Sequence, residues 1–280
     1  MLCITWLLCT AQAHAQAEKG DRLMRAYAYH NAMTAYEYAV MDDLEDIVSW
    51  ERLARCYEIL RDSRRAEIAY NNCLILGDSS QELMHAWFRS MLENAHYHEA
   101  QLAIDEYLMK YPSDTLANYL RWGLANMDEY MTKMGVYDVS LVKGVEKASS
   151  NMCPVFYKDG IAFSTNQIKR SWFTRRDRWT NEGFYQMMHA SVEGDSVYAV
   201  NWIEPVSNNT YHAGPFSMRG GGEVMYYSAN VRKPGKKPSG GDYPAVLWVY
   251  EVSKLEKGWS DPRALPFNSL EHTCTHPAIS

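Results

Sequence analysis

Two arginines, Arg55 and Arg89, are the residues of this sequence whose type and spacing indicate a binding chemistry. They lie 34 residues apart, which is also the spacing of Ala32, Ala66 and Ala100, so both hold the same position in consecutive copies of a repeat. A guanidinium group binds a carboxylate through two parallel hydrogen bonds. We therefore expect the pair to clamp an acidic or C-terminal carboxylate of a partner peptide. The alternative is that both are solvated charges on helices.

The same register places further polar and aromatic residues beside the two arginines. If each copy is a pair of helices, the first helices of successive copies line one concave groove with the side chains that do not face the core. The predicted partner-binding surface consists of Glu51, Arg55, Glu58, His85, Arg89 and Tyr119.

Histidines and a cysteine in the second half raise the question of catalytic or metal chemistry. Cys274 lies two residues before His276, and His189, His212 and His272 lie in or beside strand-like segments, but no recognised ligand spacing joins them. The sequence contains no Gly-x-Ser-x-Gly elbow, phosphate-binding glycine loop or His-Glu-x-x-His helix. We expect no catalytic residue, no metal and no cofactor. In the alternative, an exported enzyme, His212 or His276 would be essential.

The first 16 residues have features of a secretory signal peptide. A short apolar stretch is followed by small residues at Ala11-Gln12-Ala13 and Ala13-His14-Ala15, which suit cleavage. The stretch is too short to span a bilayer. We expect residues 1–16 to be removed on export. Cys9 offers the alternative of a lipid attachment site, although the bulky Leu8 precedes it.

Four cysteines remain after the predicted signal peptide, and their spacing is not that of a disulfide framework. Cys56 and Cys73 fall on different levels of an antiparallel helix pair. We expect buried free thiols at Cys56, Cys73, Cys153 and Cys274.

Charge is divided unevenly along the chain. Residues 18–147 hold 14 Lys and Arg against 22 Asp and Glu, whereas residues 148–280 hold 14 against 12. No basic face of the nucleic-acid-binding type is visible, so we expect no nucleic-acid partner. The loop at 167–181 interleaves arginines with Trp172 and Trp179, which leaves single-stranded nucleic acid or an anionic sugar as an alternative ligand.

Apolar residues recur at helical spacing from residue 18 to about residue 130. Small residues let two helices approach closely, and larger ones fill the space towards the next pair. The middle copy shows this pattern most clearly, at Trp50, Leu53, Ala54, Tyr57, Ala66, Tyr70 and Cys73. The pattern resembles the tetratricopeptide repeat. We expect residues 17–134 to form a solenoid of three helix pairs, capped by a fourth helix from Asp114 to Tyr130.

The pattern then changes to short β-strands joined by turns. Pro154, Pro215 and Pro277 recur 61 and 62 residues apart, and the first two each open a hairpin with a glycine turn. Two further strand candidates, 184–192 and 197–203, lie between the hairpins. Four strands per period is typical of the blade of a β-propeller.

Together the patterns predict an α + β multidomain chain, in which the α-solenoid is followed by an incomplete β-propeller over residues 135–280. This propeller would have two full blades and the start of a third, with residues 136–142 supplying a further strand. A propeller needs about four blades or more to close. The sequence is therefore expected to be a fragment or a truncated product.

The order of these repeats resembles a family of Gram-negative envelope proteins. The hairpins at 153–164 and 212–217 and the segments 257–260 and 265–269 are similar to TolB-type propeller repeats. In that family tetratricopeptide repeats precede the propeller, an OmpA-like peptidoglycan-binding domain ends the chain, and one member belongs to the type IX secretion machinery.

The resemblance implies a periplasmic protein associated with the outer membrane, with no transmembrane span. Its repeats would bind envelope or secretion-system proteins, and peptidoglycan would be bound only through a C-terminal domain missing from this sequence. The resulting hypothesis is a non-catalytic scaffold. The alternative is an exported propeller enzyme, a glycan or peptide hydrolase or lyase with an accessory repeat domain.

Overall fold

The computed structural model describes residues 2–132, 139–145, 150–167, 176–203, 211–231 and 246–279, with side chains from residue 11 onward. The chain forms two compact units. One comprises Met1–Asp138 and Arg178–Thr180, and the other comprises Val139–Asp177 and Asn181–Ser280. Most of the arginine-rich loop and the first half of the strand expected at 136–142 lie outside the described residues.

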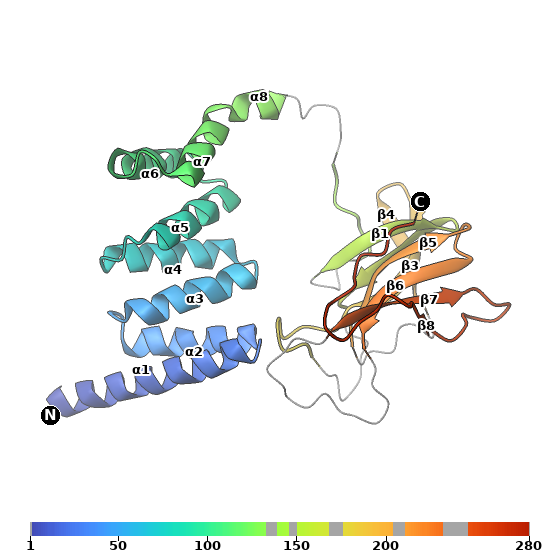
Figure 1. Ribbon diagram of the computed structural model, residues 1–280, viewed down its shortest axis with the longest axis horizontal. Coiled ribbons are helices and arrows are strands. Elements are labelled where there is room, and N and C mark those ends of the chain that lie inside the picture. Colours follow the sequence, from blue (N-terminus) through green and yellow to red (C-terminus); the bar gives the residue numbers. More distant parts are fainter. Residues whose placement is uncertain are drawn as a thin grey trace. The chain divides into compact units, whose positions relative to one another are not determined.

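The described part of the first unit is a stack of helices, each packed against the next one along the chain (Figure 1). The helices are α1 (Leu2–Arg25), α2 (Tyr29–Asp42), α3 (Ile47–Ile59), α4 (Ser63–Ile75), α5 (Gln81–Glu93), α6 (Tyr97–Lys110), α7 (Thr115–Ala125) and α8 (Met127–Thr132). The predicted signal peptide lies in the first turns of α1, and its cleavage stays a prediction.

The turn inside each helix pair has the same backbone geometry three times. Its central residue has a positive φ, at Tyr27 (54°), Arg61 (62°) and Ala95 (60°), 34 residues apart. The residue after it donates its N–H to a carbonyl five residues back, which satisfies a free carbonyl at the end of the first helix. These bonds are Ala28 to Leu23, Asp62 to Tyr57 and His96 to Met91. The predicted period of 34 is thus confirmed in the backbone.

The side chains that define the repeat also occupy matching places. Each small residue lies four positions after the N-cap of its helix, and a larger residue follows four positions later. Both sets are at most 4% exposed, and they are Ala32, Ala66 and Ala100, then Tyr36, Tyr70 and Ile104. They belong to two apolar clusters that run through the stack. The described helices form a tetratricopeptide-like array, as predicted.

The capping helix, predicted as one segment, is two helices. α7 ends at Ala125 and α8 begins at Met127. Between them, the side-chain amide of Asn126 donates a hydrogen bond of 2.7 Å to the Trp122 carbonyl, and its backbone N–H donates to the same carbonyl at 3.2 Å. The backbone bond is the last helical bond of α7, whereas the side-chain bond occupies the same carbonyl of the final turn and favours a helix end here.

The second unit contains two antiparallel sheets of four strands each, both in sequence order (Figure 1). The first sheet is β1 (Asn151–Tyr157), β2 (Gly160–Thr165), β3 (Gln186–Glu193) and β4 (Ser196–Trp202). The second is β5 (Ala213–Arg219), β6 (Val224–Asn230), β7 (Leu247–Ser253) and β8 (Arg263–Ala264). The two predicted hairpins and the strands between them are confirmed.

The first strand of each sheet is irregular at its proline. The pairing register shifts between Met152 and Val155 around Pro154 in β1, and within Ala213–Phe216 around Pro215 in β5. Proline has no N–H to donate to a ladder, so a bulge accommodates it. Pro154 and Pro215 therefore open equivalent sheets.

The two sheets pack face to face through one apolar core, to which Tyr157, Ala162 and Met187 contribute from the first sheet and Phe216, Met225 and Val252 from the second. Residues 139–142 form no strand, and Lys143 makes only an isolated bridge with Ser196. Residues 273–279, around the third recurring proline Pro277, also form no strand. The described strands form two packed sheets of four strands each. That these sheets are blades of a propeller stays a prediction.

Candidate partner-binding surface

The six predicted surface residues lie on three helices in one register. α3 carries Glu51, Arg55 and Glu58, α5 carries His85 and Arg89, and α7 carries Tyr119. The N-caps of these helices are Asp46, Ser80 and Asp114, again 34 residues apart. Asp46 and Asp114 each accept a hydrogen bond from the backbone N–H three residues later, which fixes where the helix starts. The register of the arginines follows from these caps.

The centre of this surface is a cluster around the Glu58 carboxylate. One oxygen of Glu58 lies 3.3 Å from the Arg89 guanidinium, and the other accepts a hydrogen bond of 3.1 Å from the Tyr70 hydroxyl. The cluster therefore joins α3, α4 and α5. Burial, and then the negative charge of Glu58, raise the pKa of Tyr70 above its usual range, while the charges of Arg89 and Arg55 oppose that shift.

Arg55 lies beside this cluster on the exposed side of α3. Within the described residues, no carboxylate pairs with its guanidinium, in contrast to Arg89. The two arginines thus hold the same position in the repeat but differ in their ion pairing. Arg89 is held by a carboxylate of the chain itself, and Arg55 is available to an external one.

His85 faces a different group. Its Nε2 atom lies 2.9 Å from Oδ2 of Asp114, the N-cap of α7, whose side chain is 3% exposed. The same carboxylate accepts hydrogen bonds from the Tyr107 hydroxyl (2.8 Å), the Gln81 amide (2.5 Å) and the Ala117 N–H (2.9 Å). Burial alone would raise the pKa of the Asp114 carboxyl, but these hydrogen bonds, led by that of Ala117, hold it well below its usual range. His85 is therefore part of a network that joins α5, α6 and α7.

The two remaining predicted residues are exposed. Glu51 lies one turn before Arg55 on α3. Tyr119 is 67% exposed, and its ring stacks on that of Trp122, with centroids 6.4 Å apart. The structure thus brings Arg55, Glu58 and Arg89 together and places His85 and Tyr119 in other contacts.

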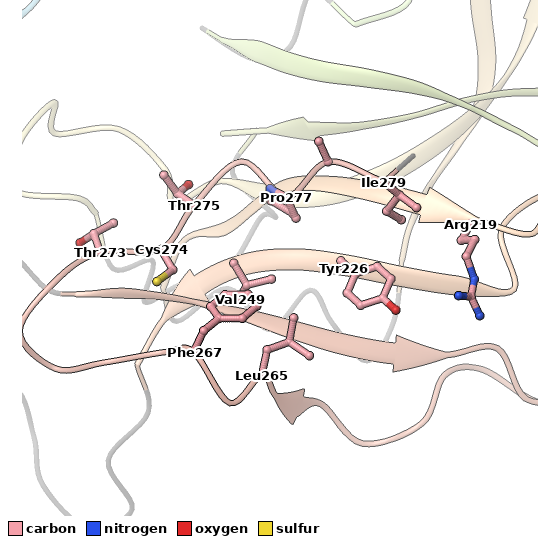
Figure 2. A pocket seen from close by; sticks show the side chains of 11 residues that line it. Arg219, Tyr226, Val249, Leu265, Phe267, Thr273, Cys274, Thr275, Pro277 and Ile279 are labelled. Carbon is pink, nitrogen blue, oxygen red and sulfur yellow. The ribbon is translucent and has the colours of Figure 1, made fainter.

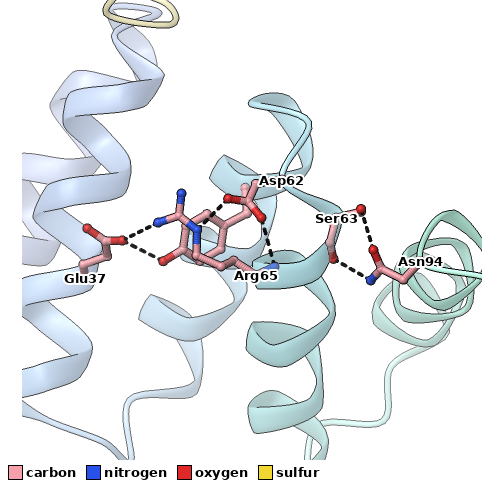
Figure 3. Close-up of polar contacts among 6 residues, drawn as sticks. Glu37, Asp62, Ser63, Arg65 and Asn94 are labelled. Atoms are coloured by element: carbon pink, nitrogen blue, oxygen red, sulfur yellow. Dashed lines mark hydrogen bonds and ion pairs between the residues drawn. The ribbon is translucent and has the colours of Figure 1, made fainter. Parts of the chain in front are cut away.

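A second polar cluster, which the sequence did not reveal, joins the helices that carry the arginines (Figure 3). Glu37 on α2 accepts hydrogen bonds from the Tyr57 hydroxyl (2.8 Å) and from Arg65 (3.2 Å), and the guanidinium of Arg65 lies 4.5 Å above the Tyr57 ring. At the next joint, the Ser63 hydroxyl donates to the Asn94 amide oxygen at 2.6 Å. These bonds join α2 to α3 and to α4, and α4 to the C-cap of α5, so they hold neighbouring helices of the stack together.

A cavity of about 700 Å³ lies in the second unit, between the outer face of the second sheet and residues 273–279 (Figure 2). Tyr226 and Val249 form its floor, and Pro277 and Ile279 lie across it from the terminal segment. Among the described residues that line it, Arg219 is the one that carries a charge. None of the predicted surface residues lies in this cavity.

The thiols and histidines of interest have defined surroundings. Cys56, Cys73, Cys153 and Cys274 are free, as predicted. The predicted burial is confirmed for Cys56 and Cys73 but is wrong for Cys153 and Cys274, which are half-buried. Burial raises the pKa of the Cys56 and Cys73 thiols to about 12. His212 accepts a hydrogen bond from the Tyr185 N–H through Nδ1, at 3.1 Å. Over the described ranges, His, Cys, Asp and Glu form no group of three suited to a metal ion.

Among the helices that the structure describes, none has the length and apolar character needed to span a membrane.

No protein-family model and no curated protein matches this chain. Among solved structures, the first TPR of Spaghetti (RPAP3) bound to the HSP90 peptide SRMEEVD matches 43% of this chain and 95% of its own, at 18% identity and a TM-score of 0.37. The Arabidopsis OM64 TPR domain matches 42% and 98%, at 14% identity and a TM-score of 0.36. The second TPR domain of human RPAP3, in complex with the HSP70 peptide SGPTIEEVD, matches 40% and 98%, at 16% identity and a TM-score of 0.35. The resemblance to OmpA-family envelope proteins finds no support in these comparisons.

Proposed function

We propose that the helical unit is a protein-binding scaffold that recognises carboxylate groups of a partner peptide through Arg55. The observation that carries the proposal is the placement of Arg55, without a carboxylate partner among the described residues, beside a carboxylate that Arg89 already holds. A guanidinium group with an exposed, unpaired edge is suited to bidentate contact with a carboxylate. Arg55 is then the primary contact.

Glu58 gives this surface its selectivity. Its carboxylate holds Arg89 and receives the Tyr70 hydroxyl, so a partner carboxylate contacts Arg89 only by sharing it with Glu58. Two carboxylates close together repel each other. The predicted clamp of two equal arginines is therefore revised to one available arginine and one arginine paired inside the chain.

The test uses the full chain and a fluorescent SRMEEVD peptide, chosen because it ends in several carboxylates. Arg55→Ala should weaken binding about tenfold, since a hydrogen bond to a charged group is worth roughly 1.5–3 kcal/mol. Glu58→Gln should strengthen binding, because it removes a like charge from the surface and frees Arg89. The control is Arg64→Ala, an exposed arginine on α4 away from this surface. Equal affinities for Arg55→Ala and Arg64→Ala would refute the proposal.

We further propose that the protein acts in the periplasm, associated with the outer membrane, where the repeats bind proteins of an envelope or secretion assembly of the type IX kind. The signal-like residues 1–16 support this location. Expression of a C-terminally tagged chain in a Gram-negative host should yield periplasmic protein from which the signal-like N-terminal residues have been cleaved. An uncleaved chain in the cytoplasm would exclude the location.

The sheets are proposed to have a docking role without catalysis. The surroundings of His212 favour a structural part for this residue, because it bonds the backbone at the entry to β3 and contacts the ring of Phe184 at 5.0 Å. A glycan and peptide hydrolysis screen on the purified chain should give no turnover. If the purified chain shows turnover and His212→Ala abolishes it, the protein is an enzyme and the scaffold hypothesis is wrong.

A further inference from the structure

Three basic side chains lie together at one end of the two packed sheets, and we call them the basic cluster. They are Lys158 in the turn between β1 and β2, His189 on β3, and Lys254, which directly follows β7. Like charges held close together repel each other. An anion bound among them would remove that repulsion.

The ring of Tyr157 places two members of the cluster. Its centroid lies 5.2 Å from the Nζ atom of Lys158 and 5.8 Å from the centroid of the His189 ring. Met187 lies in the core between the sheets, and His189, two residues later on the same strand, shares its face. His189 is half-buried and Lys158 is exposed. Both groups therefore lie at the margin of the core between the sheets.

Lys254 reaches the same place from the second sheet. The turn between β5 and β6 packs against Tyr157 so closely that a Cβ atom at Gly222 would lie 2.5 Å from a ring carbon. The backbone N–H of Lys254 donates to the carbonyl of the adjacent Glu223, at 2.7 Å. The Nζ atom of Lys254 lies 4.9 Å from the centroid of the Trp259 ring, which belongs to the same core as Tyr157.

The chain balances the charge of the basic cluster only in part. Within the described residues, the two lysines contact aromatic rings and form no ion pair with a carboxylate, and the His189 ring makes no hydrogen bond. Burial, and then the charges of Lys158 and Lys254, lower the pKa of His189. Asp159 opposes that shift, and its Oδ2 atom accepts a hydrogen bond of 3.0 Å from the Ser191 hydroxyl. The cluster thus keeps unused N–H donors and a net positive charge.

We propose that the basic cluster binds a phosphate group, either free or carried as a monoester on a larger molecule. Two ammonium groups and an imidazole offer N–H donors from three separate segments, which suits the tetrahedral oxygens of phosphate. A carboxylate is planar and is matched best by the fork of an arginine, whereas lysine binds phosphate as a compact charge. The site lies in the second unit and does not depend on the peptide-binding surface around Arg55.

Equilibrium dialysis of the full chain against radiolabelled inorganic phosphate at pH 8 tests the proposal. Sodium chloride at about 0.15 M screens non-specific attraction. The wild type should bind phosphate saturably, and Lys158→Gln and Lys254→Gln should each weaken binding about tenfold, because a hydrogen bond to a charged group is lost. The matched control is Lys110→Gln on α6, an exposed lysine that also lies over a tyrosine ring. It should bind as tightly as the wild type.

Two results would overturn the proposal. One is the absence of saturable binding by the wild type. The other is an affinity of Lys158→Gln or Lys254→Gln equal to that of the control. Glucose 6-phosphate, with glucose as the uncharged control, distinguishes the two sources of the phosphate group. Tighter binding of glucose 6-phosphate than of inorganic phosphate would assign the site to a monoester, and equal or weaker binding would assign it to the free ion.

The pKa of His189 provides a second, independent readout. The charged groups that face its ring are Lys158, Lys254 and Asp159. Saturating phosphate should raise this pKa, because a nearby anion favours the protonated imidazole. NMR titration of the histidine signals measures the change, with His189→Gln to assign the resonance. A pKa that phosphate leaves unchanged would exclude binding at this cluster.

Discussion

The ring of Tyr36 fills the space that a side chain on Gly20 would need, because a Cβ atom at Gly20 would lie 2.5 Å from a ring carbon of Tyr36. The same place in the second pair holds Ala54 beside Tyr70, and the third pair holds Phe88 with Ile104, all of them buried. The third copy thus combines a large residue on its first helix with a smaller one on its second. Phe88 fits where the sequence pattern leads one to expect a small residue.

Gly20→Ala should therefore destabilise the helical unit by about 1–3 kcal/mol, the usual cost of overpacking a core. The matched control is Gly123→Ala in α7, where a Cβ atom meets nothing within 4 Å. That variant should gain roughly 0.5–1 kcal/mol, since alanine favours a helix over glycine. Urea unfolding followed by circular dichroism at low protein concentration measures both changes, and effects of the same sign would refute the close approach.

The Asp114 network should make stability depend on pH in a defined window. The pKa of this carboxyl is lowered in the folded state, so its contribution is present above its unfolded pKa of about 3.9 and is lost as the pH falls further. Asp114→Asn should cost about 2 kcal/mol at pH 7, since hydrogen bonds to a charged group are lost. At pH 3 the difference between variant and wild type should be smaller. An equal difference at both pH values would contradict the network.

The cysteines should differ in reactivity. Burial raises the pKa of Cys56 and Cys73 to about 12, so few of these thiols ionise at pH 8, and both are also shielded from a reagent. Cys153 and Cys274 are half-buried and should react first with a maleimide. Peptide mapping by mass spectrometry gives the order of labelling. Early labelling of Cys56 or Cys73 in the folded chain would show that the helix pairs open.

Substitutions at the two residues that precede the strand prolines should change the melting temperature in opposite directions. Cys153 has a φ of 53°, and the equivalent Gly214 has a φ of 109°. A positive φ costs an ordinary residue about 1–2 kcal/mol, so Cys153→Gly should raise the melting temperature of the second unit. Gly214→Ala should lower it, because the new Cβ atom would also collide with the Ser164 side chain. Calorimetry of the full chain resolves the two cases, and a loss of stability in Cys153→Gly would exclude the strain.

Local patterns account for the part of this fold that the sequence predicts. The helix pairs are predicted by the spacing of Ala32, Ala66 and Ala100, because close packing requires small residues at a fixed spacing. The sequence does not predict the repeated turn at Tyr27, Arg61 and Ala95, because none of these residues favours a positive φ. Their conformation is imposed by the helices on either side.

The sequence predicts which residues of the candidate surface hold the same position in the repeat, but it does not predict which side chains bond to each other. The 34-residue spacing places Arg55 and Arg89 alike, whereas the bond from Arg89 to Glu58 and the contact of His85 with Asp114 depend on neighbouring helices. Asp114 precedes a helical pattern and is a typical N-cap, so its position carried a signal. Its role as acceptor for three helices required the packed structure.

Whether Arg55 itself contacts the carboxylates of a bound peptide is decided most directly by a double-mutant cycle. Binding of SRMEEVD and of a neutral analogue, with glutamines and asparagine for its acidic residues and a C-terminal amide, is measured by fluorescence anisotropy on wild type and Arg55→Ala. A coupling energy of about 1.5 kcal/mol is predicted, equal to roughly a tenfold difference in affinity. A coupling energy of zero would show that Arg55 is only a solvated charge.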